Sequence, residues 1–274
     1  MVYIFCALFS EAKPFIEKYD LTRDMTFHHY QVFRNDEMLL TVTGTGVLSA
    51  AMAVTEVCTR IPPVSCDCLL NAGIAGTMDK GISKGDVFLV NRIVDDVTKR
   101  EYFPDMIYDY GMAEGAVCTV TMPGYKEGFL TDMESSGIYA AGEKFFTADR
   151  MVFLKVVSDA GDTEGVTHEI NEMCMCGLLD KAGVLIEELV KSSSDVADYK
   201  KLEERIERLA EDMRLSVTMT SGLKQLLRYL NIEGEDVSGL IDRIYQKNVL
   251  PVTKKNEGKK IYDGIYEAVF AHLR

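Results

Sequence analysis

The chain has 274 residues, 47% hydrophobic and 27% charged, a balance typical of a soluble globular protein that can bury a full core. Its formal net charge of -13 is unevenly spread: residues 1–190 hold 15 Lys and Arg against 29 Asp and Glu, whereas residues 191–274 hold 15 against 14. An acidic main body argues against nucleic acid as a partner, because a phosphate backbone is bound by clustered Lys and Arg.

The apolar segments and the cysteines indicate the cellular compartment of the protein. No apolar run approaches 18 residues, so we expect no membrane span. The start MVYIFCALFSEAKPF lacks a basic region and meets Glu11 early, so it is interpreted as a first strand rather than a signal peptide. Seven cysteines, an odd number among apolar neighbours, favour free thiols in a reducing compartment. We expect a cytoplasmic protein with no metal site.

The first 190 residues alternate short apolar runs with helical patterns, which predicts an α/β fold. Several strands carry β-branched residues on both faces, as expected for a sheet covered on both sides. We predict a three-layer α/β/α domain with a central mixed twisted sheet. Its strands are expected at 2–8, 30–34, 38–44, 66–73, 86–94, 116–122, 129–132 and 151–159, and its helices at 47–60, 134–146 and 167–190.

The pattern changes after the segment KSSSDVAD. Apolar residues then recur at steps of three and four on one helical face: Tyr199, Leu202, Ile206, Leu209 and Met213. Further helices are predicted at 219–230, 236–246 and 259–273. We therefore divide the chain into a domain over 1–190 and an all-helical C-terminal extension over 191–274, which could bind the main domain or an unknown protein partner.

Polar and glycine-rich segments follow the predicted strands. In open α/β sheets, ligands bind beyond the carboxyl ends of strands, so these tips are candidate site positions. Glu11 follows the first strand, TGTG (with Gly44 and Gly46) the third, and NAGIAGT (with Gly73 and Ile74) the fourth. Two later tips carry Asp132-Met133-Glu134 and Ser158-Asp159. We expect the acids Glu11, Glu134 and Asp159 to converge on one crevice.

These motifs, in this order, resemble those of the purine nucleoside phosphorylase and nucleosidase superfamily. The resemblance rests on TGTG with VLSAAMA, NAGIAGT with GISKGDVFLV, TDMESSGIYAA, and FLKVVSDAGD, and it spans residues 2–190. The methylthioadenosine/S-adenosylhomocysteine nucleosidases are the most similar group. The resemblance implies a homodimer that uses no cofactor and cleaves a purine nucleoside of the 5′-modified adenosine type.

The resemblance also implies a role for each acid. Glu134 is similar to the glutamate that accepts hydrogen bonds from the ribose hydroxyls, and Met133 to the residue that packs against the nucleoside. Asp159 resembles the acid that protonates the purine N7, and Glu11 the residue that deprotonates the attacking water. Carboxylates near the ribose would also stabilise the positive charge that develops on the sugar. Gly44, Gly46, Gly73, Ile74 and Ser158 complete the predicted substrate-binding set.

Hydrolysis is favoured over phosphorolysis. Phosphorylases of this superfamily hold phosphate with arginines on the loops near the first and fourth strands. The corresponding segments here, FSEAKP and NAGIAGT, contain no arginine, and Glu11 would repel phosphate.

Two departures from the family pattern leave the substrate open. Ile74 stands where the nucleosidases place a serine, and GIAG resembles the turn of futalosine hydrolases. Only 45 residues separate Asp86 from Asp132, a span too short for the helix that normally carries the purine-stacking phenylalanine. Phe103, Tyr108, Tyr110, Tyr125 and Phe129 are candidates to replace it. The alternatives are a phosphorylase, a futalosine-type hydrolase, or a catalytically degenerate nucleoside-binding module.

Overall fold

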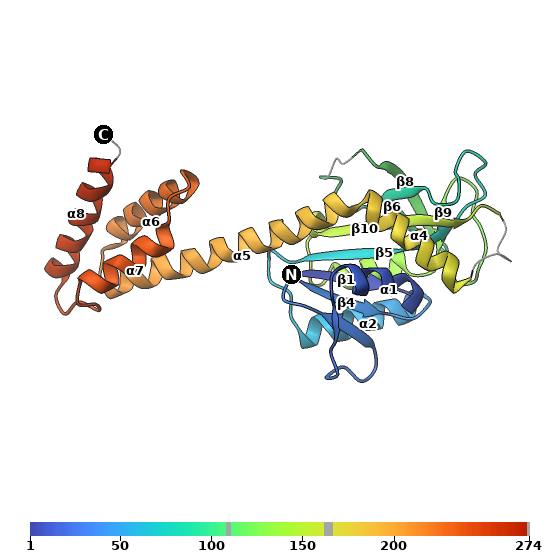
Figure 1. Ribbon diagram of the computed structural model, residues 1–274, viewed down its shortest axis with the longest axis horizontal. Helices are drawn as coiled ribbons and strands as arrows, with labels where there is room; N and C mark the ends of the chain where they lie inside the picture. The colour runs from blue at the N-terminus through green and yellow to red at the C-terminus, as the bar shows by residue number, and fades with distance from the viewer. Residues whose placement is uncertain (108–110, 162–166, 273–274) are drawn as a thin grey trace. The chain divides into compact units, whose positions relative to one another are not determined.

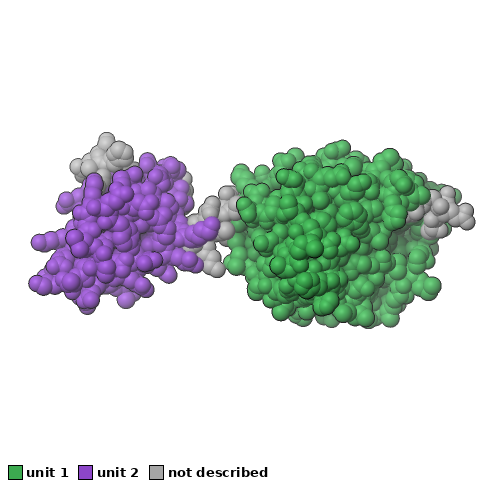
Figure 2. Space-filling view, turned by 60° about the horizontal axis from the view of Figure 1, so that its bottom comes forward, with its two compact units in different colours: residues 1–194 green, residues 195–274 purple. Residues whose placement is uncertain are grey.

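A computed structural model describes residues 1–107, 111–161 and 167–272. The chain forms two compact units, residues 1–194 and 195–274, which Figure 2 colours separately. No helix among the described residues combines the length and the apolar character needed to cross a bilayer.

The strands of the first unit form one mixed sheet (Figure 1). The strands are β1 (Val2–Cys6), β2 (Thr22–Arg23), β3 (Gln31–Arg34), β4 (Met38–Val42), β5 (Cys68–Gly76), β6 (Val87–Asp95), β7 (Glu101–Tyr102), β8 (Ala113–Thr119), β9 (Leu130–Asp132) and β10 (Met151–Asp159). β5 and β1 pair in parallel, as do β1 and β4, while β10 runs antiparallel to β6. The predicted three-layer α/β fold with a mixed sheet is confirmed.

One part of the sheet closes on itself. The strand order runs β10-β6-β8-β9-β5-β1-β4-β3-β2, and β10 also pairs with β5 in parallel. The strands β5, β10, β6, β8 and β9 therefore form a ring, in which β5 pairs with β10 on one edge and touches β9 through Gly76 and Thr131 on the other.

Helices cover both faces of the sheet. In the first unit they are α1 (Phe9–Lys18), α2 (Val47–Arg60), α3 (Ser135–Gly142), η1 (Ala148–Arg150), α4 (His168–Lys181) and the start of α5 (Gly183–Asp212). Alternate residues of β1 enter two separate cores, as the period of two in a strand requires. Val2, Ile4 and Cys6 pack with residues of α1 and α4, and Tyr3 and Phe5 pack with residues of α2 and α3.

The helix expected over 167–190 is instead two helices, and this prediction was wrong. α4 ends at Lys181, where the backbone N–H of Ala182 donates to the Leu178 carbonyl, and α5 begins at Gly183. α5 then continues to Asp212 through the segment in which the sequence pattern changes. The sequence carries a stop signal at this break, because Lys181 lies in the last turn and Gly183 directly follows the C-cap residue Ala182.

The second unit is a bundle of the end of α5 with α6 (Val217–Ile232), α7 (Val237–Lys247) and α8 (Lys255–His272). Leu202, Ile206, Leu209 and Met213 are buried in its core, as their spacing predicts; the side chain of Tyr199 lies outside the described part. Ion pairs on the surface join α5 to its neighbours, for example Arg228 with Glu203 and Arg205 with Asp242.

Close packing between α2 and α3 depends on Gly137. A Cβ at this position would lie 2.9 Å from the carbonyl carbon of Val47, which cannot move without shifting the start of α2. We expect Gly137→Ala to lower the free energy of unfolding by about 1–3 kcal/mol through overpacking. Gly177→Ala is the control, because a Cβ there meets no atom within 4 Å and replaces glycine in a helix. Urea midpoints measure both, and equal midpoints for the two variants would contradict the packing argument.

Candidate active site

The three predicted acids line one cavity of about 310 Å³ in the first unit. Glu11, Glu134 and Asp159 share its wall with apolar and small residues, and none of the described lining residues is an arginine. The full lining consists of Ala7, Leu8, Glu11, Thr45, Ile74, Ala75, Gly76, Val120, Pro123, Gly124, Tyr125, Thr131, Asp132, Met133, Glu134, Ser158 and Asp159. The site therefore combines an apolar pocket with a few polar groups, as ligand sites usually do.

Sheet topology explains why residues distant in sequence meet here. Glu11 lies in the first turn of α1, directly after β1, and Glu134 is the N-cap residue of α3, directly after β9. Asp159 is the last residue of β10 and pairs with Gly76 at the end of β5. β1 and β10 both run parallel to β5, so their carboxyl ends lie at one edge of the sheet. β9 runs antiparallel to β5, and its contact with β5 through Thr131 and Gly76 brings the segment after β9 to the same place.

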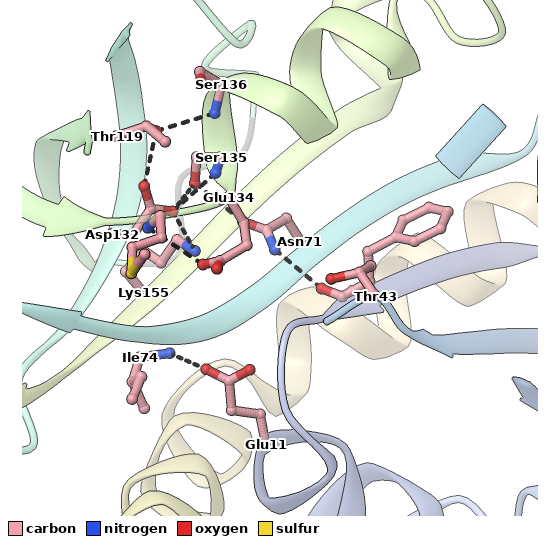
Figure 3. Close-up of polar contacts among 12 residues, drawn as sticks. Glu11, Thr43, Asn71, Ile74, Thr119, Asp132, Glu134, Ser135, Ser136 and Lys155 are labelled. Carbon is pink, nitrogen blue, oxygen red and sulfur yellow. Dashed lines mark hydrogen bonds and ion pairs between the residues drawn. The ribbon is translucent and has the colours of Figure 1, made fainter. Parts of the chain in front are cut away.

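Glu11 is buried and rigidly held. Its Oε2 accepts a hydrogen bond from the Leu8 N–H at 2.8 Å. Its Oε1 accepts one from the Ile74 N–H at 2.9 Å (Figure 3). Burial raises the pKa of Glu11 above its usual range, although these backbone donors partly oppose the shift. A carboxylate with a raised pKa and a fixed orientation is suited to accept a proton.

Glu134 is held by the TGTG turn. Gly46, with a backbone φ of 101° that only glycine adopts readily, donates its N–H to Glu134 Oε1 at 2.8 Å. Met133 donates its N–H to Oε2 at 3.3 Å. Burial and the neighbouring Asp132 raise the pKa of Glu134 to about 7. The side chain can therefore exchange a proton near neutral pH.

A buried lysine, which the sequence analysis missed, balances these acids. Lys155 of β10 is 2% exposed, and its Nζ lies 2.9 Å from Asp132 Oδ2. Burial alone would lower the pKa of Lys155, but the nearby carboxylates of Asp132 and Glu134 outweigh it and raise the pKa. The ammonium is therefore charged. The signal in the sequence is a single lysine inside the otherwise apolar strand MVFLKVVS, since lysine is almost never buried without a partner.

Asp132, which lines the cavity, is the centre of a polar network (Figure 3). It accepts hydrogen bonds from the Thr119 hydroxyl at 2.8 Å and from the Ser135 N–H at 3.0 Å, in addition to its contact with Lys155. The Ser135 hydroxyl also contacts Asn71 at 3.2 Å. These contacts tie the start of α3 to β5, β8 and β10, so the network orients the segment that carries Glu134.

Asp159 is half-buried and accepts hydrogen bonds on both oxygens. The Tyr125 hydroxyl donates to Oδ1, and the Ser158 hydroxyl donates to Oδ2 at 3.2 Å. Tyr125 belongs to the segment between β8 and β9, where the sequence is too short for the expected family helix, and the structure has a loop there.

The other predicted residues divide into two groups. Met133, Ile74 and Ser158 line the cavity, whereas Gly44, Gly46 and Gly73 lie outside its lining. A Cβ at Gly73 would lie 3.1 Å from Glu11 Oε1, so this glycine leaves room for the carboxylate rather than for a ligand. Gly44 has a φ of 79° and serves the turn itself.

Of the five aromatic candidates, Tyr125 alone is seen to line the cavity. Phe103 is 56% exposed, and Phe129 lies outside the lining, where Arg92 is placed over its ring. Tyr108 and Tyr110 fall outside the described residues. Within the described part of the chain, no group of three or more His, Cys, Asp or Glu side chains could hold a metal ion.

Comparison with known families decides the assignment. The family model described as the phosphorylase superfamily matches residues 3–146, more than half of the chain. The chain belongs to the phosphorylase superfamily. A search of curated proteins found no match.

Solved structures with this superfamily fold include several nucleosidases. A 5′-methylthioadenosine/S-adenosylhomocysteine nucleosidase from Helicobacter pylori is 13% identical with a TM-score of 0.57, over 68% of this chain and 97% of that one. The 5′-methylthioadenosine nucleosidase of Arabidopsis thaliana is 20% identical with a TM-score of 0.56, over 69% and 95%. Futalosine hydrolase of Helicobacter pylori is 14% identical with a TM-score of 0.55, over 71% and 97%. At these identities the similarity is one of fold.

The raised pKa of Glu134 predicts a pH-dependent stability. Between its ordinary value of 4.5 and about 7, the unfolded chain releases this proton while the folded chain keeps it, so stability falls as pH rises through this window. The penalty reaches roughly 3 kcal/mol for an isolated group with such a shift. We expect the stability of Glu134→Gln to fall less than that of the wild type from pH 5 to pH 8. Urea midpoints measure it, with exposed Glu127→Gln as control; parallel curves for Glu134→Gln and wild type would contradict it.

Removing Lys155 should show how much the buried acids destabilise the fold when they lack their cationic partner. We expect Lys155→Met to lower the free energy of unfolding by roughly 3–5 kcal/mol, because Asp132 then lacks its partner. Adding Asp132→Asn should restore part of the loss, since the buried charge is removed as well. Chemical denaturation measures the cycle, with exposed Lys84→Met as the control. Additive losses in the double variant would refute a coupled pair.

Proposed function

We propose that the protein is a nucleosidase that hydrolyses the N-glycosidic bond of a purine nucleoside of the 5′-modified adenosine type and releases the free base. The proposal rests on one observation: Glu11, Glu134 and Asp159 line a single cavity with no arginine among its described lining residues. The superfamily membership and the nucleosidases among the structural neighbours support it.

Each acid would have a distinct role. Glu134 accepts hydrogen bonds from the ribose hydroxyls, and its negative charge, with that of Glu11, stabilises the cationic sugar of the transition state. Glu11, fixed by two backbone donors, orients the water and takes its proton as the water attacks the anomeric carbon. Asp159 gives a proton to the purine N7, so the base leaves as a neutral molecule when the glycosidic bond breaks. Met133 contributes an apolar contact to the nucleoside.

Phosphorolysis is disfavoured by charge. A phosphate dianion needs a fork of cationic donors, and the nearest buried cation, Lys155, is held by Asp132. Glu11 lies beside the place proposed for the attacking water, and its carboxylate would repel a phosphate from that place. Water is therefore the nucleophile that this cavity favours.

A futalosine-type substrate is the second candidate. Ile74 of the NAGIAGT turn lines the cavity, and futalosine hydrolase is among the structures with this fold. We further propose a cytoplasmic homodimer that uses no cofactor. We also propose that residues 1–190 are the catalytic domain and that residues 191–274 are a helical extension that could contact an unknown protein partner.

The reaction is tested on a panel of methylthioadenosine, S-adenosylhomocysteine, 5′-deoxyadenosine and futalosine, with free base measured by chromatography. We expect base release at equal rates with and without phosphate. Strict phosphate dependence and a ribose 1-phosphate product would show phosphorolysis, and tight binding without turnover would show a nucleoside-binding module.

Asp159→Asn tests the assigned acid. A neutral amide cannot supply the proton, so we expect the turnover number to fall about 10²–10⁴-fold while substrate binding is retained. Asp149→Asn is the matched control, because Asp149 lies outside the cavity lining. Undiminished turnover in Asp159→Asn would refute the role of this residue.

A further inference from the structure

We propose that Tyr125 is a positioning residue for Asp159, an inference that rests on the proposed nucleosidase function. The Tyr125 hydroxyl donates a hydrogen bond to Asp159 Oδ1, and both residues line the same cavity. Tyr125 is thus the part of the 120–129 loop that reaches the proposed acid.

The space shared by the two side chains depends on Gly76. A Cβ at Gly76 would lie 2.9 Å from Tyr125 Cε1, and 3.0 and 3.1 Å from the two carboxylate oxygens of Asp159. Gly76 does not have the left-handed backbone that requires glycine, so its missing side chain serves this contact rather than a turn. The end of β5 is therefore shaped to hold the tyrosine ring against the aspartate.

The loop that carries Tyr125 is anchored at the next residue. The backbone N–H of Lys126 donates to the Thr131 hydroxyl at 3.2 Å, and its Nζ lies 2.8 Å from Asp96. The Phe129 N–H also donates to the Lys126 carbonyl at 3.2 Å. These contacts fix the chain beside Tyr125. Its hydroxyl can therefore contact Asp159 without the entropy cost of ordering a flexible loop.

The hydrogen bonds leave each oxygen of Asp159 able to make a further contact. Each carboxyl oxygen has two lone pairs, and the hydroxyls of Tyr125 and Ser158 each occupy one. The tyrosine can therefore hold the carboxyl plane while Asp159 contacts a ligand. This orientation would direct the proton of Asp159 towards the purine N7. A small misplacement of the carboxyl group would lower the rate of the reaction strongly.

A double-variant cycle tests the proposal with the full chain. If Tyr125 acts through Asp159, Tyr125→Phe should lower the turnover number about 10–100-fold with less than about a threefold change in KM. The same change made in Asp159→Asn should have less than about a threefold effect, because the proton it positions is gone. Phenylalanine keeps the ring, so the wall of the cavity is retained.

Tyr19→Phe is the matched control, since the Tyr19 hydroxyl is buried without a hydrogen-bond partner among the described residues. Unchanged turnover in Tyr125→Phe, an effect on KM alone, or equal losses in both backgrounds would each overturn the positioning role. Absence of base release by the wild type on every nucleoside would instead refute the nucleosidase function, and the role of Tyr125 with it. Wild-type turnover with an unaffected Tyr125→Phe refutes only the present inference.

Discussion

The end of β5 is the constraint on which the site depends. At Gly76 this strand meets β9 on one edge and β10 on the other, so the sheet closes into a ring at this point. The closure brings the segment after β9 and the last residue of β10 to the same place. Gly76 has no side chain, which leaves room for Asp159 and Tyr125. The residue at which β5 meets both neighbours thus also shapes the site.

The second constraint is electrostatic. Glu11, Asp132 and Glu134 are buried together, and burial of several carboxylates is costly unless a cation or hydrogen-bond donors compensate. Lys155 provides the cation, while backbone N–H groups of Leu8, Ile74 and Gly46 provide donors. The compensation is incomplete, which is why the pKa values of Glu11 and Glu134 stay above their usual range. Such shifts are common at functional sites, where stability is exchanged for reactivity.

The sequence predicted the positions of the acids but not their surroundings. Glu11 and Asp159 could be found because each lies at the carboxyl end of an apolar strand, and such ends meet at one edge of a parallel sheet. Glu134 also follows a strand, but β9 runs antiparallel to β5 and reaches the site through the contact of Thr131 with Gly76. Lys155 could not be placed in the same way, because alternation along a buried strand does not reveal which carboxylate lies across the sheet. Tyr125 lies in a loop without periodicity, and its contact with Asp159 depends on the path of that loop. The glycines of TGTG were expected to approach a ligand, whereas Gly46 donates to Glu134.

The absence of arginine from the described lining of the cavity has a consequence for the choice between nucleosides and nucleotides. Nucleotides are far more highly charged than nucleosides, and a 5′-phosphoryl group would bring negative charge towards Glu11, Glu134 and Asp159 with no guanidinium among the described lining residues to receive it. The first 190 residues, with 29 acidic against 15 basic side chains, add a repulsive field at longer range. Electrostatic repulsion alone would thus disfavour the binding of adenylates, without steric exclusion by the pocket.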